Sequence, residues 1–251
     1  MVWSGSHYGV NGAKTSPRKA PVNAPTAAQP GSRRPLPRTQ LSDQVAEHLR
    51  AAIMSGTLRP GTFIRLDETA AQLGVSITPV REALLKLRGE GMVQLEPHRG
   101  HVVVPLSRQD IDDIFWLQAT IAEELAATAT DHITDEEIDE LDHINEALAA
   151  AVGSGDADAI AALEFAFHRV FNQASGRIKL AWFLLHAARY TPVMVYAADP
   201  EWGAAAVDNH RKLIAALRRR DTAAVVNHTR WQFTDGVRRL TEKRARSGVW
   251  T

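Results

Sequence analysis

Between residues 40 and 104 the chain reads as three short amphipathic helices followed by two short strands. In segments 40–55, 66–73 and 79–90 the apolar residues recur every three or four positions, the period of a helix with one buried face. Segments 92–96 and 101–104 flank a Pro-His-Arg-Gly turn, which is typical of a hairpin. Three helices and a hairpin in this order predict a winged helix-turn-helix.

The third of these helices carries the most informative pattern. Thr78 is expected to cap it through its side-chain oxygen, and Pro79 suits the first helical position. Arg81 and Arg88 share the face opposite the apolar stripe. That stripe consists of Val80, Leu84 and Leu87. The pattern therefore predicts a helix with a buried side and a basic side.

The rest of the chain has strong helical periodicity and few strand signals. We expect N-terminal caps at Ser107 with Asp110 and at Thr134 with Glu137. The expected helices span about 108–130, 135–152, 157–175, 178–197, 206–219 and 222–244. The predicted fold class is mainly α, an N-terminal winged helix-turn-helix followed by an all-α helical bundle.

Charge and composition divide the chain into three regions. Residues 1–38 carry six basic residues, no acidic residue and six prolines, which predicts a disordered basic arm. The arm either contacts a polyanion partner or is a solvated tail without a partner. Residues 39–105 form the small domain, with seven basic and seven acidic residues, and residues 106–251 the helical domain, with 16 basic and 22 acidic residues. There is no cysteine and no apolar stretch of membrane-spanning length, so we expect a cytoplasmic protein without a membrane partner.

Short catalytic and nucleotide-binding motifs are absent. The sequence has no phosphate-cradling Gly-Lys-Ser/Thr loop, no G-x-G-x-x-G after a strand, no H-E-x-x-H and no G-x-S-x-G. This weakens the case for an enzyme, and we expect a protein without catalytic residues. It does not exclude an enzyme, because many enzymes lack short motifs.

Residues 41–104 bear a specific resemblance. They contain QVAEHLRAAIMSGTLRPG, then ETAAQLGVSITPVREALLKLRGEGMV, the hairpin RG and VVV. In this order they closely resemble the DNA-binding domain of the GntR family of bacterial transcription regulators. The resemblance implies a double-stranded DNA operator as partner, a homodimer on a pseudo-palindromic site, and repression relieved by a ligand as the commoner mode. An architectural protein that binds DNA without a ligand is the alternative.

The resemblance also implies which residues contact DNA. It assigns Thr78 and Arg81 to the major groove, where a first-turn arginine meets base edges, and Arg99 and Gly100 to the wing. The predicted DNA-binding set is Arg65, Ser76, Thr78, Arg81, Arg99 and Gly100. Arg65 is either a phosphate contact or an ordinary solvated arginine. Ile77 and Leu66 stand where the family usually has an arginine and an acid, so we expect an altered operator sequence.

Residues 107–240 resemble the FCD subfamily, whose all-helical domain binds fatty-acid or organic-acid effectors. Glu164-Phe165-Ala166-Phe167-His168 matches a family pattern of an acid and a histidine one helical turn apart, a spacing that lets both bind one divalent ion. His210 matches a metal-ligand position; taken alone, its apolar face indicates a buried, hydrogen-bonded histidine instead. The resemblance implies a divalent metal such as zinc and a small carboxylate effector.

The fourth ligand position is open. Counting along the family pattern reaches Gln232, and the nearest histidine is His228, one turn earlier; His186 is a third candidate, and water a fourth. The predicted metal set is Glu164, His168, His210 and His228, with Gln232 at the expected fourth position. Ala119 replaces a frequent arginine of the first FCD helix, so anchoring of the effector carboxylate is expected to differ. A metal-dependent enzyme using Glu164, His168 and His210 is the rival reading.

Overall fold

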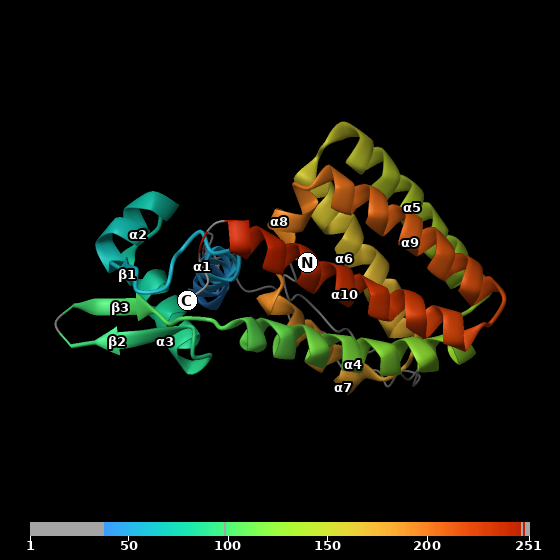
Figure 1. Ribbon diagram of the computed structural model, residues 1–251, viewed down its shortest axis with the longest axis horizontal. Coiled ribbons are helices and arrows are strands. Elements are labelled where there is room, and N and C mark those ends of the chain that lie inside the picture. The colour runs from blue at the N-terminus through green and yellow to red at the C-terminus, as the bar shows by residue number, and fades with distance from the viewer. Residues whose placement is uncertain (1–37, 98, 247, 249–251) are drawn as a thin grey trace, which may run out of the picture.

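The computed structural model describes residues 38–97, 99–246 and 248. The basic arm predicted for 1–38 therefore lies outside the described residues except for Arg38, where the first helix begins. Figure 1 shows a small helical part with a three-stranded sheet at one end and a bundle of longer helices at the other. The fold is mainly helical, as the sequence predicts.

The N-terminal part has the predicted helices and hairpin. Its elements are α1 (Arg38–Met54), β1 (Phe63–Ile64), α2 (Leu66–Leu73), α3 (Ile77–Gly89), β2 (Val93–Glu96) and β3 (Gly100–Val103). The sheet order is β1-β3-β2 with antiparallel pairs. The strand β1 lies outside the predicted elements because two residues leave no period to detect. Val80, Leu84 and Leu87 of α3 are fully buried, as predicted, and Arg81 and Arg88 are exposed.

The cap predicted at Thr78 is wrong. Ser76 is the N-cap of α3, in extended conformation (φ −77°, ψ 165°), and its side chain makes no capping hydrogen bond. Thr78 therefore lies inside the first turn. Pro79 occupies the third helical position instead of the first. The N–H groups of the first four helical residues have no acceptor within the helix, so a proline at the third position removes no hydrogen bond. The side chains of Ser76 and Thr78 are exposed at this helix end.

The C-terminal part is an all-helical bundle. It contains α4 (Arg108–His132), α5 (Asp135–Ser154), α6 (Ala157–Ala174), α7 (Ile178–Ala187), η1 (Ala188–Tyr190), α8 (Val193–Ala197), α9 (Pro200–Arg218) and α10 (Thr222–Arg246). The caps predicted at Ser107 and Thr134 are both present as reciprocal capping boxes. The helices α4 and α10 run side by side along the bundle (Figure 1). Within the described ranges, no helix is long and apolar enough to cross a membrane.

The single helix predicted over 178–197 is wrong. The chain breaks there into α7, η1 and α8, because a proline disfavours helical backbone in the residue before it. Thr191, which precedes Pro192, is extended (φ −87°, ψ 117°). The next helix starts at Pro200 instead of 206, because Asp199 caps its first turn through the backbone N–H groups of Glu201 and Trp202.

The two parts are packed together. Met54, Ile111 and Leu240, from α1, α4 and α10, belong to one apolar cluster. The guanidinium of Arg244, 1% exposed, donates from Nη1 to the carbonyl oxygens of Ile53 and Met54 at 2.9 Å each. Those carbonyls end α1, so a side chain of the bundle caps the C-terminus of a helix in the N-terminal part.

Candidate metal centre and DNA-binding surface

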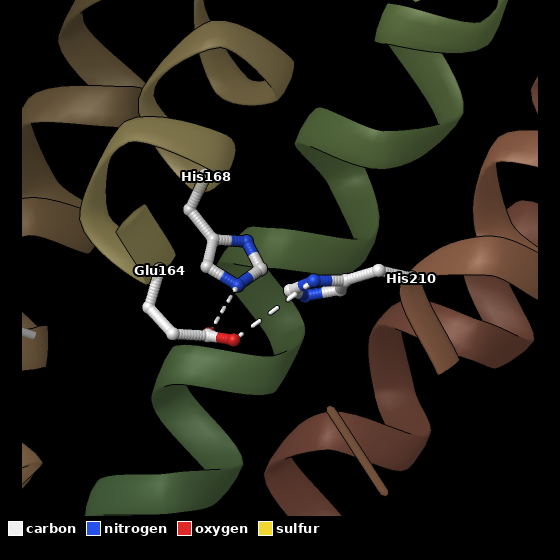
Figure 2. Close-up of side chains that lie close together, drawn as sticks. All are labelled: Glu164, His168 and His210. Atoms are coloured by element: carbon white, nitrogen blue, oxygen red, sulfur yellow. Dashed lines mark ion pairs between the residues drawn. The ribbon is translucent and has the colours of Figure 1, made fainter. Parts of the chain in front are cut away.

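Three buried polar side chains meet inside the bundle. Glu164 and His168 lie one turn apart on α6 and point toward His210 of α9 (Figure 2). His168 Nε2 is 3.4 Å from Glu164 Oε2, and His210 Nδ1 is 3.9 Å from Glu164 Oε1. Their exposed fractions are 2%, 6% and 1%, in the order Glu164, His168, His210. The structure thus brings together the first three residues of the predicted metal set.

Close helix packing fixes the position of His210. Gly203 of α9 approaches α5 so closely that a Cβ there would lie 2.8 Å from Val152 Cγ2. Two turns further along α9, the ring of His210 stacks on Phe167 of α6, with centroids 3.8 Å apart and planes 8° from parallel. The imidazole therefore has aromatic packing on its face and the carboxylate near its edge.

Asn145 of α5 also contacts the cluster, although it is not among the residues predicted for the metal site. It is fully buried, its Oδ1 accepts a hydrogen bond from His210 Nδ1 at 3.2 Å, and its Nδ2 donates to the carbonyl of Val207 at 3.2 Å. This places the hydrogen of His210 on Nδ1 and leaves the lone pair on Nε2. The signal in the sequence is an amide within an apolar helical stripe formed by Ile138, Leu141 and Leu148.

Burial and mutual charge set the ionisation of the cluster. Burial lowers the pKa of His210 to about 4, although the neighbouring Glu164 carboxylate acts in the opposite direction. Burial alone would raise the pKa of Glu164, but His210 and His168 outweigh it and the pKa is lowered. At neutral pH the cluster therefore contains a carboxylate and a neutral imidazole, which are the forms that bind metal ions.

These residues fit a divalent ion. Glu164 Oε1 is buried and, within the described part of the chain, has no hydrogen-bond partner. A buried unpaired carboxylate oxygen is costly, and a cation beside it would remove that cost. The three ligand atoms lie within 4.8 Å of one another. Ligands at about 2.1 Å from an ion lie roughly 3–4.2 Å apart, so binding requires a small contraction.

Gln232 occupies the side of the cluster where a fourth ligand is expected. Its Nε2 lies 2.7 Å from His168 Nε2. His228 is not brought to the cluster, because its Nδ1 is hydrogen-bonded to Asn209 Oδ1 at 3.0 Å. His186 is also elsewhere: its ring lies tilted against that of Trp182, with centroids 3.7 Å apart, and its Nδ1 is hydrogen-bonded to the carbonyl of the same residue.

Two small cavities border the cluster. One, of about 50 Å³, reaches Glu164, and the other, of about 20 Å³, reaches His168. Gln232 and Phe233 of α10 border both cavities and so form the wall between them. The helical domain therefore has room for small ligand groups directly beside the polar cluster.

The N-terminal end of α3 exposes three residues of the predicted DNA-binding set. Ser76, Thr78 and Arg81 are all exposed there. Unpaired N–H groups and the positive end of the helix dipole favour phosphate at such an end. Arg65 precedes α2, with its side chain 67% exposed and 3.6 Å from Glu68, a weak ion pair that DNA could replace.

The wing presents the remaining two residues. Arg99 is exposed at the β2–β3 hairpin, and its guanidinium lies over the ring of Phe63, 4.4 Å from the centroid. Gly100 has φ +100°, a backbone conformation that favours glycine.

A winged helix-turn-helix joined to an all-helical domain is the architecture of a class of DNA-binding regulators. Residues 41–103 match the model of the bacterial regulatory proteins of the gntR family, and residues 113–231 match the FCD domain. The chain belongs to the GntR family of transcription regulators and carries a C-terminal FCD domain. Because the members of this family are regulators, the rival reading as a metal-dependent enzyme is set aside.

Several relatives share most of this architecture. The probable D-xylose utilization operon transcriptional repressor of Paenarthrobacter nicotinovorans is 30% identical over 188 residues, 74% of this chain and 82% of the relative. The gluconate operon transcriptional repressor of Bacillus subtilis is 28% identical over 207 residues, 76% and 82% of the two chains. The structure of McbR/YncC from E. coli superposes with a TM-score of 0.63 at 24% identity, covering 81% of this chain and 98% of that one, and supports the fold alone.

Proposed function

We propose that this regulator is a repressor that a small carboxylate releases from DNA, with a divalent ion, zinc first among candidates, held by Glu164, His168 and His210. The observation that carries the proposal is the buried Glu164 Oε1, which faces two imidazoles beside two cavities and has no hydrogen-bond partner among the described residues. A bound ion would supply the positive charge that attracts a carboxylate. The two relatives named as repressors support the sign of regulation.

DNA reading is assigned to residues 39–105 and ligand sensing to 106–251. Ser76, Thr78 and Arg81 read the major groove and Arg65 contacts phosphate; the wing residues Arg99 and Gly100 contact the neighbouring groove. Their exposure on one small domain supports these roles. A homodimer would place two such domains on the half-sites of a pseudo-palindrome.

Exposed aromatic residues support a homodimer. Trp116 on α4 and Phe183 on α7 are 67% and 55% exposed, and these two helices pack against each other. Large exposed apolar residues on adjacent helices are typical of an interaction surface. Trp116→Asp with Phe183→Asp should convert the dimer to a monomer in sedimentation analysis.

The test of the regulator begins with DNA selected from a random pool by the wild-type protein. Arg81→Ala should lose the preference for selected over random DNA, because an arginine–base contact contributes about 1–3 kcal/mol. Arg88→Ala is the matched control, because Arg88 is exposed on the same helix but lies about three turns from its N-terminus. A panel of carboxylates is then added to the zinc-loaded protein on DNA. Stable DNA binding that no carboxylate alters would contradict the repressor proposal and favour an architectural protein.

A further inference from the structure

The two cavities beside the cluster have largely apolar walls. Phe115, Val193, Trp202 and Phe233 line the larger one. Leu184, Leu213 and Phe171 contribute to the smaller one. No lysine or arginine borders either cavity among the residues that the structure describes. A ligand that enters here therefore finds no cationic side chain away from the cluster.

The side chains of Gln118, Thr191 and Tyr196 in the wall of the larger cavity are already hydrogen-bonded. Gln118 Nε2 donates to the carbonyl of Ala187 at 2.9 Å, and Thr191 Oγ1 donates to Gln118 Oε1 at 3.0 Å. The hydroxyl of Tyr196 donates to the carbonyl of Gly236 at 2.7 Å. The hydroxyls of Thr191 and Tyr196 each have a single hydrogen, so they would have to leave their internal acceptors before they could donate to a second anionic group of a ligand.

The net charge of the cluster also favours a ligand with a single anionic group. Glu164 contributes one negative charge, and metal binding requires neutral imidazoles at His168 and His210. A divalent ion therefore leaves the site with one net positive charge. One carboxylate neutralises that charge, whereas a second carboxylate would place an unpaired negative charge between apolar walls, which is strongly unfavourable.

We propose, resting on the function proposed above, that the ligand is a monocarboxylate with a short apolar body. Its carboxylate faces Glu164, His168 and His210 across the bound ion, and its body lies between Phe115, Trp202 and Phe233. Because the larger cavity is only about 50 Å³, close to the space of one or two water molecules, the side chain of Phe233 moves to join the two cavities around the ligand.

The test compares three four-carbon probes that differ only at their ends: butyrate, succinate and butan-1-ol. Each is titrated into zinc-loaded full-length protein, and binding is followed by thermal shift and by release of selected DNA. Butyrate should half-saturate the protein at a concentration at least tenfold below that of succinate or butan-1-ol, and chelation of zinc should abolish its effect.

A lysine placed in the wall of the larger cavity should shift the preference from butyrate toward succinate. Thr191 borders the larger cavity and is half-buried, so a lysine there could place its ammonium group in the cavity. Thr191→Lys should shift the butyrate-to-succinate preference at least tenfold toward succinate. Thr120→Lys is the control, because it adds the same charge at an exposed position of α4.

The outcomes separate this inference from the function on which it rests. If zinc binds and succinate binds as tightly as butyrate, or if only a dicarboxylate or tricarboxylate releases DNA, the monocarboxylate assignment is overturned and the proposed function stands. If the protein binds no divalent ion, both fail. Should Thr191→Lys not fold, the three probes on the wild-type protein still decide the matter.

Discussion

Gln232→His should raise the affinity of the protein for zinc at least tenfold. In the wild-type protein Gln232 Nε2 lies 2.7 Å from His168 Nε2, the atom that would coordinate the metal ion. In the tautomer that binds a metal, Nε2 of His168 presents its lone pair, the amide of Gln232 donates to it, and an ion has to displace the amide. A hydrogen bond of this kind contributes a net ~1 kcal/mol, about fivefold in affinity.

A histidine at this position removes the competing amide and adds an imidazole ligand. Changes in residues that merely support a metal ligand alter affinity about 10- to 100-fold, and a ligand itself should matter at least as much. Gln232→Ala should show the first effect alone, a gain of about fivefold. Competition against a chromogenic zinc chelator measures both variants, and His228→Ala, with its ring on Asn209, is the control that should change nothing.

The sign of the Gln232→Ala result is decisive. If this variant binds zinc more weakly than wild type, the amide oxygen is itself a ligand and the competition argument is wrong. If His228→Ala loses zinc, the last helix is shifted by one turn in the metal-bound protein, and His228 is the fourth ligand.

Two further predictions concern stability. In metal-free protein, the free energy of unfolding should fall as pH drops from about 6.5 to about 4. The folded pKa of His210 is about 4, below its unfolded value, so the unfolded chain takes up the proton first. Urea titrations across this range should give a flatter pH profile of stability for His210→Phe, and an unchanged profile would contradict the assignment. Arg244→Leu should lower the free energy of unfolding by about 2–4 kcal/mol in urea titrations, because it removes the donor to two carbonyls that end α1. Arg246 is exposed, so Arg246→Leu should have little effect on the free energy of unfolding. Equal effects of the two substitutions would refute the capping role of Arg244.

Local patterns account for what the sequence predicted well. The capping boxes at Ser107 and Thr134 depend on residues three positions apart, and the pairing of Glu164 with His168 depends on one helical turn. The buried stripe of α3 is likewise a property of consecutive turns. In each case the residues that interact are neighbours along the helix, so their spacing contains the information.

Contacts between distant segments were beyond such reasoning. Asn145 reaches His210 across 65 positions, and Arg244 reaches α1 across 190. His210 was predicted as a metal ligand only from the resemblance to the FCD subfamily, because the apolar helix face around it indicates a buried, hydrogen-bonded histidine. The break at Pro192 is a different failure, because apolar residues on both sides of the proline suggested one continuous helix.

The segment around that break connects the ligand cavities to the DNA-binding part. Thr191 borders the larger cavity, and the adjacent Tyr190 of η1 lies against α1 and α3, with its ring 5.8 Å from the guanidinium of Arg50 and its hydroxyl interacting with Glu90. Arg50 and Glu90 are themselves paired at 2.6 Å. If the proposed carboxylate displaces the wall of this cavity, we expect the displacement to reach the Arg50–Glu90 pair at the end of α3 through Tyr190.

Tyr190→Phe tests this connection. Without its hydroxyl the segment loses its contact with Glu90, while the ring still packs near Arg50, so DNA affinity without ligand should stay within about twofold of wild type. Release of DNA by a carboxylate should weaken, because the coupling free energy falls. By thermodynamic linkage, the factor by which ligand lowers DNA affinity equals the factor by which DNA lowers ligand affinity, and both should shrink together. If DNA affinity is lost outright, or if both factors equal those of the wild type, η1 does not carry the signal and the route must pass through α10 and Arg244.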